Sequence, residues 1–168
     1  MPIAPGQALP NATLYEFIEE ETPGCAVGPN GFEVADMIKG KRLVVFGLPG
    51  AYTPTCSAKH VPGYVAMAEQ IKAKGVDEIW CISVNDAFVM GQWGKEQGAR
   101  GKVRMFGDGN AAFSKAIDLT LDLTGRGMGI RSNRYAMIVD NGVVEKLFVE
   151  QAGKFEVSSA ESILAALS

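Results

Sequence analysis

The chain has 168 residues, of which 47% are hydrophobic, and its formal net charge is −3. This length suits one well-buried core and is short for two, so we expect a single domain over residues 1–168. The charges form no long run of either sign, which argues against a nucleic-acid partner or a polybasic membrane anchor. Residues 1–10 carry no basic leader, and no apolar stretch reaches the roughly 20 residues of a membrane span, so we expect a cytoplasmic protein.

The first forty residues contain turn signals at residues 22–24 and 29–31 around short apolar pieces. These signals predict strands and hairpins ahead of the main unit. Residues 42–48 form a nearly continuous apolar run, which is typical of a strand buried on both faces of a sheet. Residues 78–84 read as a second buried strand, and the segment between the two strands has helical spacing. The chain therefore contains a βαβ unit.

The helix of this unit is predicted to start near Thr53 and to end at Gly75. Thr53 suits the N-cap and Pro54 the first turn, whereas Pro62 lies inside the helix and should bend it.

The rest of the chain alternates between short helices and strands. A strong hairpin signal spans residues 134–149 around the turn Asn141-Gly142. Ser158 with Glu161 predicts a capping box before a last helix. The remaining predictions are a helix over 85–97, a strand over 103–106 and a helix over 110–119. The fold class is therefore α/β with a mixed central sheet flanked by helices.

The segment 49–60 follows the first buried strand and carries the most informative residues. Reacting groups in α/β sheets favour this edge of the sheet. Cys56 is predicted to occupy the first helical turn, where unpaired N–H groups and the positive end of the helix dipole stabilise a thiolate. The Thr53 hydroxyl, three residues earlier, is placed to reach the sulfur or an incoming oxygen, and Pro49 should shape the loop and help to exclude water. These groups suit the binding of two bonded oxygens, one of which the sulfur displaces.

The spacing Pro49-x-x-x-Thr53-x-x-Cys56 resembles the active-site pattern of the peroxiredoxins. The longer stretch over residues 49–62 is similar to the type II, or peroxiredoxin-5-like, branch. Further similar blocks follow in order at residues 75–79, 83–90 and 131–140. The resemblance thus covers nearly the whole chain.

This resemblance implies a thioredoxin-like fold with an N-terminal extension, and a thiol-dependent peroxidase. Cys56 would become a sulfenic acid on reducing hydrogen peroxide or an alkyl hydroperoxide. Arg131 would be the family's active-site arginine, although spacing alone does not separate it from Arg134 or Arg126. The resemblance further implies a non-covalent homodimer that is recycled by thioredoxin, glutaredoxin or glutathione.

Cys81 and Cys25 lie outside this pattern. The odd number of cysteines and the absence of a Cys-x-x-Cys pair argue against a disulfide scaffold, and one histidine leaves the ligand set for a structural zinc incomplete. We therefore expect no metal and no cofactor. Strand alternation predicts that Cys81 is a buried core thiol, while plant-like relatives use a cysteine at this place to resolve the sulfenic acid. Other relatives resolve it near the C-terminus, where this chain has Ser158 and Ser159, and Cys25 is expected to be an incidental surface thiol.

Several alternatives stay open at this point. His60 lies one helical turn after Cys56 and is expected either to support the structure or to tune the site indirectly. The pattern Gly125-x-Gly127-x-Gly129 does not join a strand to a helix, so it is discounted as a dinucleotide site. A thiol-based peroxide sensor and a non-catalytic thioredoxin-like binding module are the alternative functions, and peroxide turnover would separate them from an enzyme.

Overall fold

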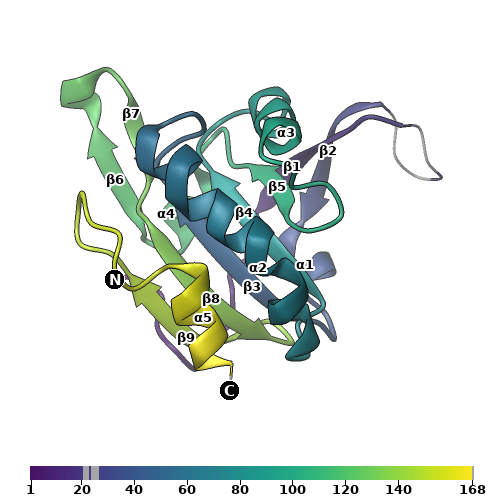
Figure 1. Cartoon of the computed structure of the whole chain (residues 1–168). Coiled ribbons are helices and arrows are strands. Elements are labelled where there is room, and N and C mark those ends of the chain that lie inside the picture. Colours follow the sequence, from purple (N-terminus) through teal and green to yellow (C-terminus); the bar gives the residue numbers. More distant parts are fainter. Residues whose placement is uncertain (21–22, 24–26, 168) are drawn as a thin grey trace.

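The computed structural model describes residues 1–20, 23 and 27–167, which are built around a seven-stranded sheet (Figure 1). Its strand order is β2-β1-β5-β4-β3-β8-β9. The centre consists of three parallel strands, β3 (Arg42–Leu48), β4 (Glu78–Ser83) and β5 (Arg104–Gly107). β8 (Tyr135–Asp140) pairs antiparallel with β3 and forms a hairpin with the edge strand β9 (Val143–Val149). The predicted mixed sheet is therefore confirmed.

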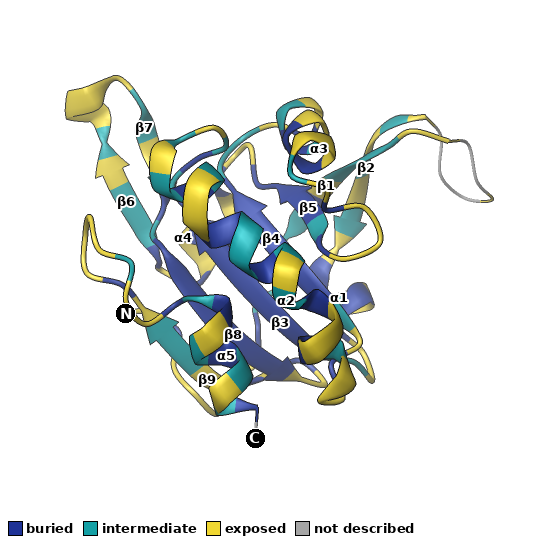
Figure 2. Ribbon diagram, viewed as in Figure 1, coloured by how far each residue is buried: buried dark blue, intermediate teal, exposed yellow. Residues whose placement is uncertain are grey.

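Helices cover both faces of this sheet, so its three central strands are buried except at the first residue of each (Figure 2). One face packs against α2 (Val61–Ala73), α3 (Ala87–Glu96) and α5 (Ala160–Ala166). The other face packs against the short helices α1 (Val34–Met37) and α4 (Ala112–Ala116). Alternate residues of β3 point into the two cores, which explains why the strand reads as a continuous apolar run.

The N-terminal extension is a hairpin of β1 (Thr13–Ile18) and β2 (Gly28–Glu33), as expected. The turn predicted at residues 29–31 is wrong, because these residues lie inside β2 and pair with β1. β2 is an edge strand, where a proline without an N–H is tolerated. Of the turn signal at 22–24 only Pro23 is described. The expectation of a surface thiol at Cys25 also lies outside the described residues.

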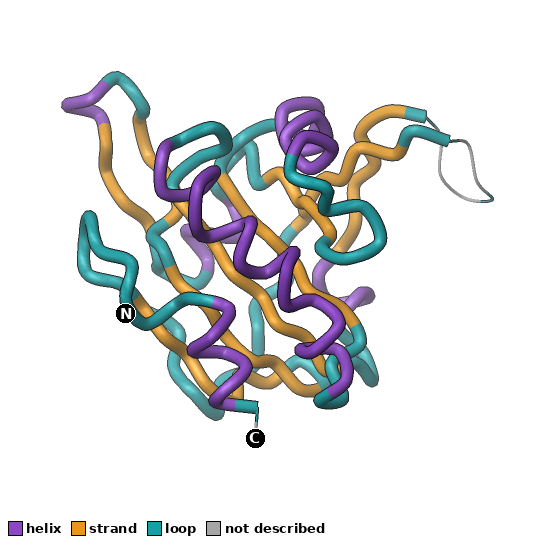
Figure 3. The backbone as a smooth tube through the Cα atoms, in the orientation of Figure 1, coloured by secondary structure: helices purple, strands orange, loops and turns teal. Residues whose placement is uncertain are grey.

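A second, two-stranded ribbon was not predicted. It consists of β6 (Thr120–Leu123) and β7 (Gly129–Ser132), joined by a 3₁₀ turn at Thr124–Arg126 (Figure 3). The three glycines at 125, 127 and 129 lie at the tip of this ribbon, where Gly127 and Gly129 have positive φ. These glycines therefore lie between two strands and not between a strand and a helix, which agrees with discounting a dinucleotide site.

The predicted helix after β3 is present, but its start is not regular. Cys56–His60 form a π-helical turn that leads into α2, and Pro62 follows directly at the start of the α-helix. A π turn often marks a functional site, and proline removes a backbone donor at such a transition. Gly75 ends the helix in a left-handed conformation, as predicted.

The start of the last helix differs by one residue from the prediction. The N-cap is Ser159, whose hydroxyl accepts from Ser162 N at 3.1 Å. The hydroxyl of Ser158 is engaged elsewhere, by the carboxylate of Glu150. The predicted capping box of Ser158 and Glu161 is therefore wrong.

Candidate active site

Cys56 begins the π turn at the C-terminal end of β3, and its side chain is fully buried. The thiol is free. The strand delivers the chain to Pro49, and the loop then reverses through Tyr52, which adopts a positive φ of 65°. Non-glycine residues rarely adopt this conformation, so the surrounding contacts must hold the loop in place.

Arg134 supplies the hydrogen bond that reaches the sulfur. Its Nη2 donates to Cys56 Sγ at 3.1 Å, and its Nη1 lies 2.7 Å from His60 Nδ1. The antiparallel register pairs Gly47 with Tyr135, so the residue before Tyr135 lies at the end of β3, where the Cys56 loop begins. A fixed positive charge at this distance favours the thiolate over the thiol.

The structure corrects the choice of arginine made from the sequence. We expected Arg131 to stabilise the thiolate, but the guanidinium on the sulfur belongs to Arg134. Arg131 instead donates from Nε to Met128 O at 2.8 Å and from Nη1 to Val84 O at 3.1 Å. A Cβ added to Gly50 would lie 3.3 Å from Arg131 Nη1, so this side chain packs against the Cys56 loop. Arg131 therefore joins the β6–β7 ribbon to the loop.

His60 is fully buried and contacts the site through Arg134. Its Nε2 lies 3.1 Å from the carbonyl of Ser158. Since a carbonyl only accepts and a guanidinium only donates, the proton must be on Nε2 and the lone pair on Nδ1. Burial, and then the charge of Arg134, lower the pKa of His60 to about 3. His60 is thus a neutral ring that contacts the Arg134 guanidinium, and its indirect role at the site stays a prediction.

Thr53 and its neighbours hold the loop in front of Cys56. The Thr53 hydroxyl donates to Gly50 O at 2.7 Å, and Ala51 N donates to Asn85 Oδ1 at 3.0 Å. The Thr53 carbonyl accepts from Ser57 N at 2.9 Å at the start of the helix, while the proton of the Thr53 side chain goes back to the loop. Its oxygen can therefore serve only as an acceptor for a bound molecule. The sequence predicted Asn85 only as the first residue of the helix over 85–97, but its side chain also fastens this loop.

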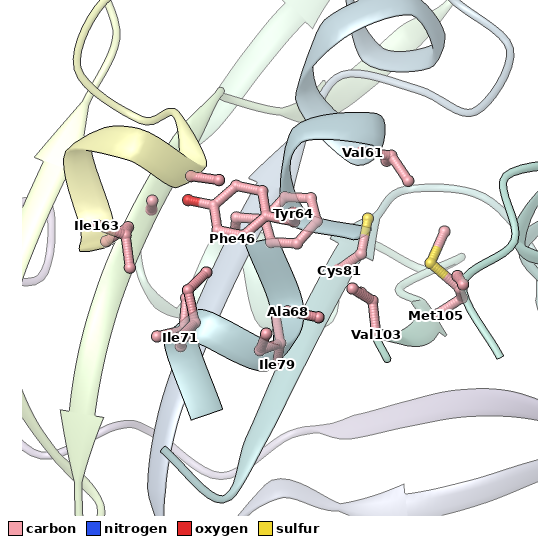
Figure 4. Close-up of a cluster of buried hydrophobic side chains, with 14 of the residues drawn as sticks. Phe46, Val61, Tyr64, Ala68, Ile71, Ile79, Cys81, Val103, Met105 and Ile163 are labelled. Atoms are coloured by element: carbon pink, nitrogen blue, oxygen red, sulfur yellow. The ribbon is translucent and has the colours of Figure 1, made fainter. Parts of the chain in front are cut away.

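Cys81 lies in the core beneath α2, in the cluster that contains Phe46 and Tyr64 (Figure 4). It is fully buried, as strand alternation predicted. Burial, and then the neighbouring Cys56, raise the pKa of the Cys81 thiol well above its usual value, while Arg134 lowers it. Cys81 is therefore a protonated thiol at neutral pH and a weak nucleophile in this conformation.

Comparison with known proteins identifies the family of this site. Residues 4–164 match the family described as Redoxin. Peroxiredoxin-2B of Arabidopsis thaliana is 45% identical over 166 residues, which cover 99% of both proteins. Reduced Prx3 of Vibrio vulnificus in complex with H₂O₂ superposes with a TM-score of 0.91 at 52% identity, covering 99% of both chains. The chain belongs to the peroxiredoxin family. It is a thiol-dependent peroxidase with the thioredoxin-like fold of that family.

A structure from Burkholderia cenocepacia, described as a thioredoxin reductase, is also similar. Its TM-score is 0.98 at 62% identity, covering 100% of this chain and 99% of that one. A dinucleotide-dependent reductase requires a glycine-rich loop between a strand and a helix. That description is of the Burkholderia protein; in this peroxiredoxin Gly125 and Gly127 lie in the β6–β7 turn and Gly129 begins β7, so they do not form such a loop.

In the part of the chain that the structure describes, no helix is both long and apolar enough to cross a membrane.

Proposed function

We propose that Cys56 is the nucleophile with which this peroxiredoxin attacks its hydroperoxide. The observation that carries the proposal is the hydrogen bond from Arg134 Nη2 to Cys56 Sγ at 3.1 Å, at the start of a helix. Both the guanidinium and the helix N-terminus favour a thiolate, which is the reactive form.

In the proposed reaction the thiolate attacks the terminal oxygen of the hydroperoxide. A sulfur–oxygen bond forms as the oxygen–oxygen bond breaks, and two electrons pass from the sulfur to the peroxide. The departing alkoxide or hydroxide takes up a proton and leaves as an alcohol or water. Cys56 is left as a sulfenic acid, the first and reversible step of cysteine oxidation.

The neighbouring residues divide the remaining tasks. Thr53 Oγ1 has committed its proton to Gly50 O, so it accepts the O–H of the hydroperoxide. Arg134 stabilises the charge that develops on the peroxide oxygens, taking the role expected of Arg131. Pro49 shapes the loop between β3 and Thr53. Hydrogen peroxide and alkyl hydroperoxides are the proposed substrates, and the complex of Vibrio vulnificus Prx3 with H₂O₂ supports the first of them.

We propose that an external thiol, from glutaredoxin, thioredoxin or glutathione, returns the sulfenic acid to the thiolate. Two thiols supply the electrons, giving a disulfide and one water. Cys81 is the competing candidate, but its thiol is buried and protonated, and the helix start would have to unfold locally to admit a disulfide.

A non-covalent homodimer and a cytoplasmic location are also part of the proposal. Gel filtration and cell fractionation test them.

The test is peroxide consumption by the wild type and Cys56→Ser, each with thioredoxin, glutaredoxin and glutathione in parallel. We expect sustained turnover by the wild type and none by the variant. Wild-type turnover in Cys56→Ser would contradict the role of Cys56. Oxidation of Cys56 without sustained turnover with any reductant would instead favour a peroxide sensor.

A further inference from the structure

Glu150 follows the last strand, and its side chain is almost wholly buried, with 4% of its surface exposed. One carboxylate oxygen, Oε2, accepts four hydrogen bonds. Three come from the consecutive amides of Glu156, Val157 and Ser158 at 2.8, 2.8 and 2.9 Å, and one from the Ser158 hydroxyl at 2.7 Å. Such a set of converging donors suits an anion. Burial opposes the charge, but these donors outweigh burial and hold the pKa of Glu150 below its usual value.

These hydrogen bonds fix the position of Ser158, which donates to the carboxylate from both its amide and its hydroxyl. The carbonyl of Ser158 accepts from His60 Nε2 at 3.1 Å and from the Tyr64 hydroxyl at 2.8 Å. It thereby fixes both the ring and the tautomer of His60, which leaves Nδ1 as the acceptor for Arg134.

These contacts form a closed ring that returns to Arg134. Glu150 N donates to Arg134 O at 2.9 Å, so Glu150 holds the backbone of Arg134 directly and its side chain through Ser158 and His60. The guanidinium is a rigid planar fork. When His60 fixes Nη1, the direction of Nη2 toward Cys56 Sγ is fixed as well.

The loop over residues 151–158 also covers this circuit of contacts. The centroid of the Phe155 ring lies 5.0 Å from that of the His60 ring and 5.8 Å from Arg134 Cζ. This contact is within cation–π range. Release of the loop would therefore free His60 and uncover the guanidinium together.

We propose that Glu150 is a positioning residue for the peroxidase reaction, acting through Ser158 and His60 to hold Arg134 on Cys56. The proposal rests on the role of Cys56 given above. A purely electrostatic role for Glu150 would change the thiolate fraction of Cys56 in the opposite direction. Loss of its negative charge would by itself favour the thiolate, whereas loss of its positioning would disfavour it. Among the described residues, Arg134 faces the sulfur directly, His60 acts on it through Arg134, and Cys81 is a neighbouring thiol.

The test compares Glu150→Gln with Glu156→Gln. Both variants remove one carboxylate from the same loop, but the side chain of Glu156 is exposed, and only its backbone N–H contributes to the ring. His60 is the only histidine of the chain, so its ¹⁵N signals need no assignment. In the wild type and Glu156→Gln we expect a neutral Nε2–H ring that titrates near pH 3. In Glu150→Gln we expect mixed tautomers and a titration closer to the usual value of about 6.5.

The second measurement is the pH profile of Cys56 alkylation by iodoacetamide, followed by mass spectrometry of the Cys56 peptide. In Glu150→Gln the profile moves to higher pH, and peroxide reduction at pH 7 falls by about 10-fold, while Glu156→Gln matches the wild type. An unchanged His60 spectrum in Glu150→Gln, or a profile that moves to lower pH, would overturn the proposal. The NMR result does not depend on peroxide turnover, so it is separate from any failure of the proposed function.

Ser158→Ala serves if Glu150→Gln does not fold. It removes one of the four donors to Glu150 and keeps the amide and carbonyl of residue 158. We expect the His60 titration and the pH profile of Cys56 alkylation to shift in the same directions as in Glu150→Gln, but by less. A His60 titration identical to that of the wild type would contradict the proposal.

Discussion

Replacing Arg134 by lysine separates the two arginines that the sequence left undecided. Arg134 uses two nitrogens at once, Nη1 beside His60 and Nη2 on Cys56 Sγ. A lysine keeps the charge, but its single nitrogen cannot hold both partners in the geometry of the planar fork. The lost bond is one to a charged group, worth about 1.5–3 kcal/mol. We therefore expect kcat/KM for hydrogen peroxide to fall by about 10- to 150-fold.

The assay is stopped-flow fluorescence of the reduced protein mixed with hydrogen peroxide. Trp93 is a suitable reporter, because its Nε1 donates to the hydroxyl of Ser57, next to Cys56. Arg131→Lys is the matched control, since Arg131 bonds two backbone carbonyls rather than the sulfur. We expect it to lose less than about 10-fold. A larger loss in Arg131→Lys than in Arg134→Lys would refute the assignment of the two arginines.

Three further predictions concern stability and recycling. The unfolded chain protonates His60 near pH 6.5 but the folded chain only near pH 3, so the free energy of unfolding falls by up to about 5 kcal/mol as the pH drops between these values. Chemical denaturation should therefore show a flatter pH dependence of this free energy in His60→Gln. The same pH dependence in the variant and the wild type would contradict the burial of a neutral ring. Gly47→Ala should lower the free energy of unfolding by about 1–3 kcal/mol, because its Cβ would lie 2.3 Å from Tyr135 Cε1; an unchanged urea midpoint would count against this packing. Cys81→Ser should keep most of the turnover with glutaredoxin or glutathione, and an intramolecular Cys56–Cys81 disulfide in the wild type after one equivalent of peroxide would reverse that prediction.

The sequence predicts those parts of the fold that depend on local patterns. The apolar run of β3, the Asn141-Gly142 hairpin and the helix ending at Gly75 each carry their own signal, and each is confirmed. Cys56 was placed correctly at a helix start, because the end of a buried strand, a proline loop and helical spacing follow one another directly.

The errors arise where a tertiary contact decides. Arg134 reaches Cys56 only because β8 pairs antiparallel with β3, and spacing along the chain does not encode that register. Ser158 has the sequence context of an N-cap, but Glu150 binds its hydroxyl and the cap moves to Ser159. Pro29 and Gly31 are typical of turns, yet pairing with β1 extends them into an edge strand. The β6–β7 ribbon is short and only partly buried, so it lacks the apolar pattern that would reveal it.

The central claim is that Cys56 is the residue that peroxide oxidises, and trapping of the sulfenic acid tests it most directly. The reduced protein is treated with one equivalent of hydrogen peroxide in the presence of dimedone, and the modified peptide is identified by mass spectrometry. We predict that the adduct lies on Cys56 in the wild type and is absent from Cys56→Ser, which should also consume no peroxide. An adduct on Cys81 with Cys56 unmodified, or undiminished peroxide consumption by Cys56→Ser, would contradict the assignment.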